Sequence, residues 1–140
     1  MIVVLDTNVV VQALIGSEAG ASARAVRAIT LNRIRVALSD DARRELAATL
    51  THPKVRERHQ GTENDVARFL SALWSNAIDF GQIAAEVRGV RDVTDRKFLA
   101  LAQTSAADFL VTNDRRHLLP LNRFGQTKIV TPAAFLRHLK

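Results

Sequence analysis

The chain has 140 residues, with 20 Lys and Arg against 14 Asp and Glu, a formal net charge of +6 and no cysteine. This length predicts a single domain over residues 1–140, and the lack of cysteine excludes disulfides, thiolate zinc sites and cysteine nucleophiles. No apolar run approaches the roughly 20 residues that cross a bilayer, and the N-terminus lacks the features of a secretory signal. We therefore expect a cytoplasmic protein without membrane contact.

The excess of positive charge permits two interpretations. A net charge of +6 favours a polyanionic partner, but it is also what solubility alone would favour. If several acidic residues gather in one cleft, the remaining surface is more basic than the total indicates. An acidic cleft within a basic surface would suit a metal-dependent enzyme that acts on a phosphodiester backbone.

Residues 2–5, Ile-Val-Val-Leu, form an unbroken apolar run that is typical of a parallel strand covered on both faces. Ligands of open α/β sheets bind beyond the carboxyl ends of the strands, so Asp6, which directly follows this run, is a candidate site residue. Thr7 and Asn8 come next. Asp6 and Asn8 can instead simply cap the following helix, which both residue types do well.

Two helices and a strand are predicted next. The pattern favours a short helix over residues 9–14, ended by Gly16, and an amphipathic helix over about residues 18–31. Arg24 and Arg27 give the second helix a basic outer side, which either meets a polyanion or is an ordinary solvated face. Residues 36–38 then form a short strand.

A third helix is predicted over residues 42–50, after the helix-starting residues 39–41. Glu45 lies about one turn into it. A side chain in the first turns after a parallel strand is close to the carboxyl edge of the sheet, where Asp6 is also expected. The alternative is that Glu45 is an exposed helix residue paired with a nearby arginine.

The middle of the chain is expected to serve the fold. Residues 54–61 are polar and basic and are predicted to be a loop. Thr62 and Asp65 have the spacing of a capping box, and the apolar positions from Val66 to Trp74 repeat with the period of a helix. The aromatic residues of this helix are expected in the core rather than stacked on bases. Residues 77–80 are a further candidate strand.

In the second half of the chain, acidic residues again lie at the start of a predicted helix and after a predicted buried strand. A helix is predicted over residues 98–102. Asp92 or Thr94 can cap it, leaving Asp95 in its first turn, where the helix dipole favours a carboxylate with or without a catalytic role. Residues 108–112 form a second buried strand that ends in Thr112, and Asn113 and Asp114 follow.

The chain closes with a short helical turn over residues 115–120, which carries Arg115 and Arg116, a strand over 128–130 and a helix over 133–139. Strands separated by helices along the whole length predict an α/β fold. We expect three layers, α/β/α, around a central, mostly parallel sheet of four to five strands.

Four carboxylates, those of Asp6, Glu45, Asp95 and Asp114, are thus expected on one edge of the sheet. Without a cation they would repel one another, so a site of this kind ordinarily holds metal. Oxygen ligands favour Mg²⁺, with Mn²⁺ as a substitute. One or two such ions can activate water and stabilise the leaving oxygen of a phosphodiester.

Several segments resemble the PIN-domain ribonuclease family, and within it the VapC-like toxin components of bacterial toxin–antitoxin pairs. The likeness covers nearly the whole chain, and the motifs occur in order and at suitable spacing. They are residues 2–8, residues 39–46 with 50–54, residues 95–102, residues 110–114 and residues 128–132.

The resemblance implies a compact α/β/α domain that cuts RNA with Mg²⁺ or Mn²⁺, forms a homodimer and is silenced by an antitoxin protein. It places the four carboxylates named above in the family's acidic positions. Thr7, Asn8, Thr112 and Asn113 would support them. We expect surface arginines, among them Arg24, Arg27, Arg115 and Arg116, to hold the RNA backbone.

The sequence departs from the family pattern at two points. The run before the third acid is often richer in acids and proline, so Asp92 can share or replace the role of Asp95. The fourth acid is often preceded by glycine, where this chain has Asn113.

Two other functions fit parts of the sequence. A catalytically silent domain that binds RNA or a protein is one, although a bare acidic cleft would repel RNA. A phosphatase that forms an aspartyl-phosphate on Asp6 is the other, but the second acid that such enzymes place two residues downstream is here Asn8. The four histidines are scattered, so no histidine base is expected.

Overall fold

The fold is described from a computed structural model, which covers residues 1–59, 61–83 and 93–139, with the backbone alone for residues 93–95. The strands are β1 (Ile2–Leu5), β2 (Arg35–Leu38), β3 (Ile78–Asp79), β4 (Phe109–Val111), β5 (Arg123–Phe124) and β6 (Thr127–Val130). The helices are α1 (Thr7–Ile15), α2 (Ala21–Leu31), α3 (Asp40–Thr51), α4 (Pro53–Arg58), α5 (Glu63–Trp74), α6 (Val93–Ser105) and α7 (Pro132–His138), with a 3-10 turn at Leu119–Leu121.

The strands form one sheet in the order β3-β2-β1-β4-β6-β5. All neighbours are parallel except β5 and β6, which form an antiparallel hairpin. The two central strands are in register with Val3 opposite Phe109 and Leu5 opposite Val111. The carboxyl ends of β1 and β4 therefore lie side by side.

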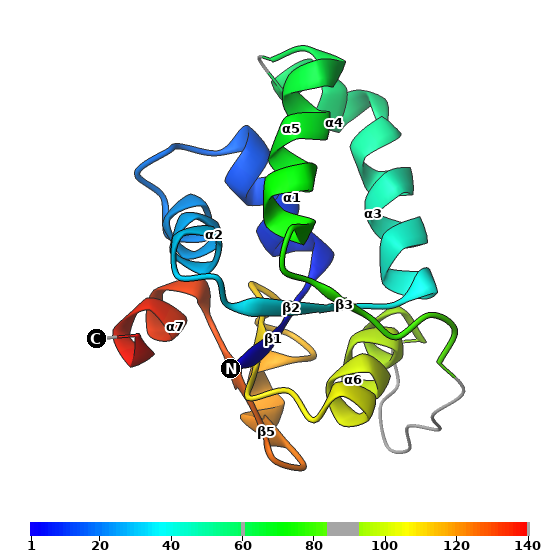
Figure 1. The fold of residues 1–140 in the computed structure, drawn as a ribbon, viewed down its shortest axis with the longest axis vertical. Coiled ribbons are helices and arrows are strands. Elements are labelled where there is room, and N and C mark those ends of the chain that lie inside the picture. The colour runs from blue at the N-terminus through cyan, green and yellow to red at the C-terminus, as the bar shows by residue number, and fades with distance from the viewer. Residues whose placement is uncertain (60, 84–92, 140) are drawn as a thin grey trace.

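Alternate side chains of β1 face two separate cores. Val3 and Leu5 pack with residues of α1, α2 and α7, whereas Val4 packs on the other face with residues of α6. Figure 1 shows α6 on one side of the strands and α1, α2, α3 and α5 on the other. The predicted three-layer α/β/α class is confirmed, since helices cover both faces of a mostly parallel sheet.

The structure corrects two details of the expected elements. Residues 54–61 were predicted to be a loop, but most of this stretch forms α4 (Pro53–Arg58), which has Pro53 in its first turn and contributes no buried residue. The sheet also has β5, one strand more than predicted, joined to β6 by a tight turn in which Gly125 has a φ of +60°. Such short elements carry too little apolar pattern to be recognised in the sequence.

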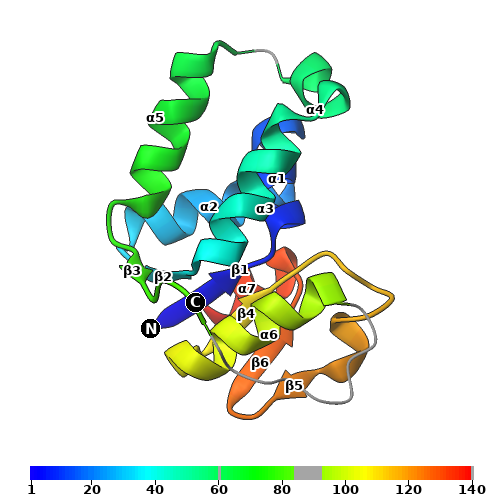
Figure 2. The same ribbon diagram turned by 90° about the vertical axis from the view of Figure 1, so that its right-hand side faces the viewer.

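Helices α4 and α5 pack loosely on the rest of the molecule. The capping box of Thr62 and Asp65 forms as predicted, but Leu73 is the only buried residue of α5. Figure 2 shows α4 and α5 extending away from the sheet beyond α1 and α3. The sheet and the helices α1, α3 and α6 therefore provide the rigid surroundings for the acidic residues described next.

Candidate active site

The polar residues that follow the neighbouring strands β1 and β4 lie at the same edge of the sheet. Asp6 directly follows β1, and its backbone N–H donates to the carbonyl of Val111 in β4 at 3.0 Å. Thr112 follows β4, and its backbone N–H donates to the carbonyl of Val130 in β6 at 3.0 Å. Parallel pairing thus fixes both residues side by side, as the sequence predicted.

The carboxylate of Asp6 is buried among polar groups at the floor of the site. The residue is 7% exposed. Its Oδ2 accepts hydrogen bonds from the Thr112 hydroxyl at 2.6 Å and from the Asn8 side-chain amide at 3.2 Å. Asp6 occupies the N-cap position of α1 but makes no side-chain capping bond there. The backbone N–H of Asn8 lowers the pKa of Asp6 as a capping contact would, but capping does not account for the hydrogen bonds from the Thr112 hydroxyl and the Asn8 side chain.

Burial raises the pKa of Asp6 to about 6. The hydrogen bond from Thr112 acts in the opposite direction, and the negative charges of Glu45 and Asp114 raise the pKa further. The carboxylate is therefore close enough to both acids to be repelled by them. A cation placed among these oxygens would remove the repulsion.

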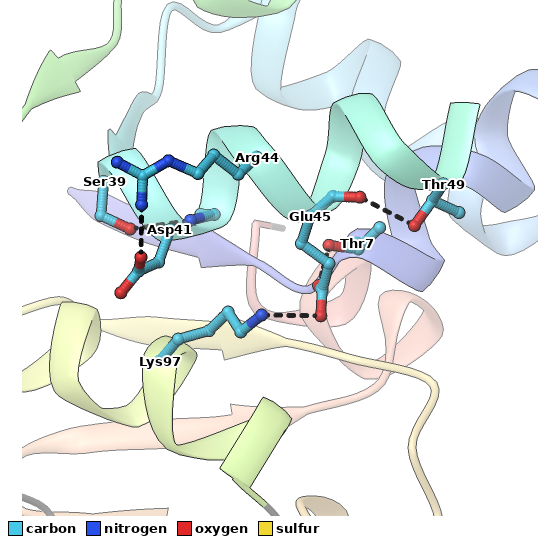
Figure 3. A network of polar contacts seen from close by, with 8 residues as sticks. Thr7, Ser39, Asp41, Arg44, Glu45, Thr49 and Lys97 are labelled. Carbon is cyan, nitrogen blue, oxygen red and sulfur yellow. Dashed lines mark hydrogen bonds and ion pairs between the residues drawn. The ribbon is translucent and has the colours of Figure 1, made fainter. Parts of the chain in front are cut away.

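Glu45 reaches the same place from α3. One carboxylate oxygen, Oε2, accepts a short hydrogen bond from the Thr7 hydroxyl. The other, Oε1, forms an ion pair with Nζ of Lys97 on α6 (Figure 3). The two atoms are 3.1 Å apart. The partner is thus a lysine far along the chain rather than a nearby arginine, and both side chains are about four-fifths buried, at 21% and 22% exposure for Lys97 and Glu45.

Asp114 has a structural task as well as a place near the site. Its Oδ1 accepts the backbone N–H groups of Arg116 and His117 at 3.0 and 3.1 Å, and its Oδ2 lies 3.5 Å from Nδ1 of His117. Its own backbone N–H donates to the Thr112 hydroxyl at 2.9 Å. The Thr112 side chain therefore links the loop of Asp114 directly to Asp6.

Asn113 ties the site to α1 and α2. Its backbone N–H donates to Asn8 Oδ1 at 3.2 Å, and its side-chain amide donates to the Ser22 hydroxyl at 3.2 Å. Asn8 therefore bonds to residues on both sides, to Asp6 through its amide and to Asn113 through its carbonyl. The four supporting residues predicted from the sequence, Thr7, Asn8, Thr112 and Asn113, all contact or flank an acid.

The third acidic position stays a prediction. Asp92 lies outside the described residues, and of Asp95 only the backbone, in the first turn of α6, is described. Among the side chains that the structure does describe, no three His, Asp or Glu are grouped so that they could hold a metal ion. Asp6 and Glu45 nevertheless fit Mg²⁺, which commonly binds through one or two carboxylates and keeps several waters.

Asp6 and Glu45 open onto a shallow depression of about 330 Å³, lined also by Asn8, Gln12 and Thr49. A second depression of about 400 Å³ shares Asn8 and Gln12 with the first and continues to Ser22 and Asn113. Sequence reasoning missed Gln12 and Thr49. Each lies four residues after a predicted site residue on the same helix, and this spacing was the available signal.

The four candidate arginines are all exposed, two on α2 and two directly after Asp114. Their exposure suits contact with a nucleic-acid backbone, but it is equally the ordinary state of surface arginines. Their role therefore stays a prediction. None of the helices among the described residues is long and apolar enough to cross a membrane.

The structure also gives a pH prediction for the metal-free protein. Because folded Asp6 has a pKa of about 6 against an ordinary 3.8, the folded state holds this proton more tightly than the unfolded chain. The free energy of unfolding should therefore fall as the pH rises from about 4 to above 6, by about 3 kcal/mol in total. Urea unfolding in EDTA, wild type beside Asp6→Asn, measures this difference. If the free energies of unfolding of wild type and Asp6→Asn change with pH in parallel from pH 4 to pH 7.5, the prediction is wrong.

Comparison with known proteins adds two findings. A family model described as a PIN domain matches residues 2–116, a range that contains every predicted acidic position. A chain in the crystal structure of VapBC2 from Rickettsia felis bound to a DNA fragment from their promoter is 19% identical, with a TM-score of 0.62, covering 94% of this chain and 98% of that chain. Likeness at this identity concerns the fold alone. No curated relative matches the sequence.

Proposed function

The chain belongs to the PIN domain family, and from this premise we propose that it is a metal-dependent endoribonuclease that acts as the toxin of a toxin–antitoxin pair. One observation carries the proposal. The buried carboxylate of Asp6 is repelled by the charges of Glu45 and Asp114, although the three residues come from the loop after β1, from α3 and from the loop after β4. A fold has no structural need for such repulsion, whereas a divalent cation does need clustered oxygens.

In this proposal Asp6 and Glu45 hold the cation, with Asp114 and the predicted Asp95 completing the acidic set. The Thr112 hydroxyl and the Asn8 amide fix the orientation of Asp6, and the Thr7 hydroxyl fixes that of Glu45. These donors hold the carboxylates in one arrangement, which lowers the cost of organising the site when the cation binds.

The bound cation, Mg²⁺ or in its place Mn²⁺, would activate water and stabilise the charge on the phosphate oxygens. The chain itself supplies the surroundings. The two adjoining depressions along α1 give a strand of RNA a path past Asp6, lined by the uncharged polar groups of Gln12, Ser22 and Asn113. Exposed arginines, including Arg24, Arg27, Arg115 and Arg116, would hold the phosphates on either side.

The proposed partners follow from the same reading. The similar chain comes from a structure of VapBC2 bound to a DNA fragment from their promoter. We propose that this chain likewise has a cognate antitoxin protein, which silences the nuclease. The active form would be a homodimer in the cytoplasm. A gene for a small DNA-binding protein directly beside this one would support this part of the proposal.

Removal of the metal tests the activity. Purified protein should cleave a labelled single-stranded RNA in Mg²⁺ or Mn²⁺, and cleavage should stop in excess EDTA and return when metal is restored. The readout is the appearance of shorter fragments on a denaturing gel. RNA that is retained by the protein but left intact in both metals would instead identify a catalytically silent binding domain.

A further inference from the structure

Lys97 forms an unusual ion pair beside the acidic site. Its Nζ lies 3.1 Å from Oε1 of Glu45, with both side chains less than a quarter exposed. In the other ion pairs of the described residues, at least one side chain is 46% exposed or more. Exposed pairs contribute little to stability, and a buried pair often costs as much in desolvation as it gains. A well-buried lysine at this position therefore calls for another explanation than stability.

The two central carboxylates are treated differently by their surroundings. Both oxygens of Glu45 are engaged, one by the Lys97 ammonium and one by the Thr7 hydroxyl (Figure 3). Asp6 accepts hydrogen bonds only from the neutral groups of Thr112 and Asn8, and no cation of the described residues forms an ion pair with it. The chain thus neutralises one acid itself and leaves the other without positive charge.

Lys97 is held in this position by the helix that carries it. The residues that follow, Phe98, Leu99 and Leu101, are at most 2% exposed and pack against the sheet. The backbone of α6 is therefore anchored in the core close to Glu45, which keeps the ammonium group within reach of the carboxylate.

We propose that Lys97 limits the acidic site to a single divalent cation, by supplying beside Glu45 the positive charge that a second ion would otherwise bring. The inference rests on the proposed metal-dependent function. Lys97 is a positioning residue in this account, since it acts through Glu45 and the charge of the site.

The geometry explains why a second ion is excluded. Two catalytic ions lie about 3.5 to 4 Å apart, and each needs carboxylate oxygens at about 2.0 to 2.1 Å for Mg²⁺. An ion on Oε1 of Glu45 would have to displace the ammonium or lie within a few ångströms of it. Two positive charges at this distance repel each other, and the repulsion is stronger here than in bulk water because the side chains of Lys97 and Glu45 are only 21% and 22% exposed. The single ion proposed above, by contrast, needs Asp6 and only Oε2 of Glu45. These oxygens accept hydrogen bonds from neutral groups, so the ion displaces no positive charge.

The test is the number of Mn²⁺ ions bound, measured without RNA by titration calorimetry and by electron paramagnetic resonance of free Mn²⁺. Wild type should bind one equivalent, and Lys97→Met should bind two. Lys97→Arg keeps the charge and should bind one. Arg43→Met is the matched control, because it removes a cation from the exposed ion pair with Asp79 and should leave the count at one.

Each outcome decides the matter. Two equivalents in wild type would overturn the inference and leave the proposed nuclease intact, and this result needs no variant to fold. One equivalent in a folded Lys97→Met, checked by circular dichroism, would reduce Lys97 to a link between α3 and α6. No binding in wild type would overturn the metal dependence of the proposed function itself, together with this inference.

Discussion

Asp6→Asn is expected to lower the rate of RNA cleavage by at least about 100-fold, the scale seen when one group that stabilises developing charge is lost. The amide keeps the shape of the side chain and its place beside Thr112, but it carries no charge to attract a divalent cation. The fold should persist, because a buried carboxylate with a raised pKa costs stability when it ionises. Initial rates on a labelled RNA in Mn²⁺ measure the effect.

Asp79→Asn provides the matched control. It makes the same chemical change at an exposed carboxylate of β3 that pairs with Arg43, and it should cleave RNA at the wild-type rate. Cleavage by folded Asp6→Asn as fast as by wild type would refute the assignment of the active site.

Phe135→Ala should lower the free energy of unfolding by about 3 to 5 kcal/mol, the usual cost of deleting a fully buried aromatic ring. Phe135 on α7 is 0% exposed and meets Phe109 of β4 edge-on, with ring centroids 5.6 Å apart at 75°. The cavity would lie under the strand that leads to Thr112. Urea unfolding followed by circular dichroism, in EDTA, gives the value directly.

Arg137→Ala on the same helix is the reference for this experiment. Its side chain is exposed, so the change should stay within about 0.5 kcal/mol. A loss below 1 kcal/mol for Phe135→Ala would mean that α7 contributes little to the core. In that case the part of the chain beyond residues 2–116, the range matched by the family model, would be less important to the fold than its packing indicates.

Sequence reasoning succeeded where a local pattern carries the information. The apolar runs before Asp6 and before Thr112 mark two buried strands, and parallel pairing then requires their ends to meet. Glu45 was placed by its distance from the end of β2. Helix α5 was located by its capping box and by its apolar period.

The contacts that the sequence could not predict join residues that are far apart along the chain. Thr112 and Asp6 are 106 positions apart, and Lys97 and Glu45 are 52 apart. No periodicity links such residues, since only the packing of α6 against α3 and the sheet brings Lys97 to Glu45. From the sequence alone, a lysine on a helix is expected to be exposed to solvent.

The strand β6 has a further consequence for how the protein is made. Thr112, which holds the carboxylate of Asp6, is itself held by the backbone of Val130. Translation proceeds from the N-terminus, so the ribosome produces every candidate acid before it produces the strand that fixes their arrangement. A nascent chain would therefore carry the complete acidic set while still lacking the strand that completes the sheet beside it. If the chain cuts RNA as proposed, no cutting should begin before β6 has joined the sheet.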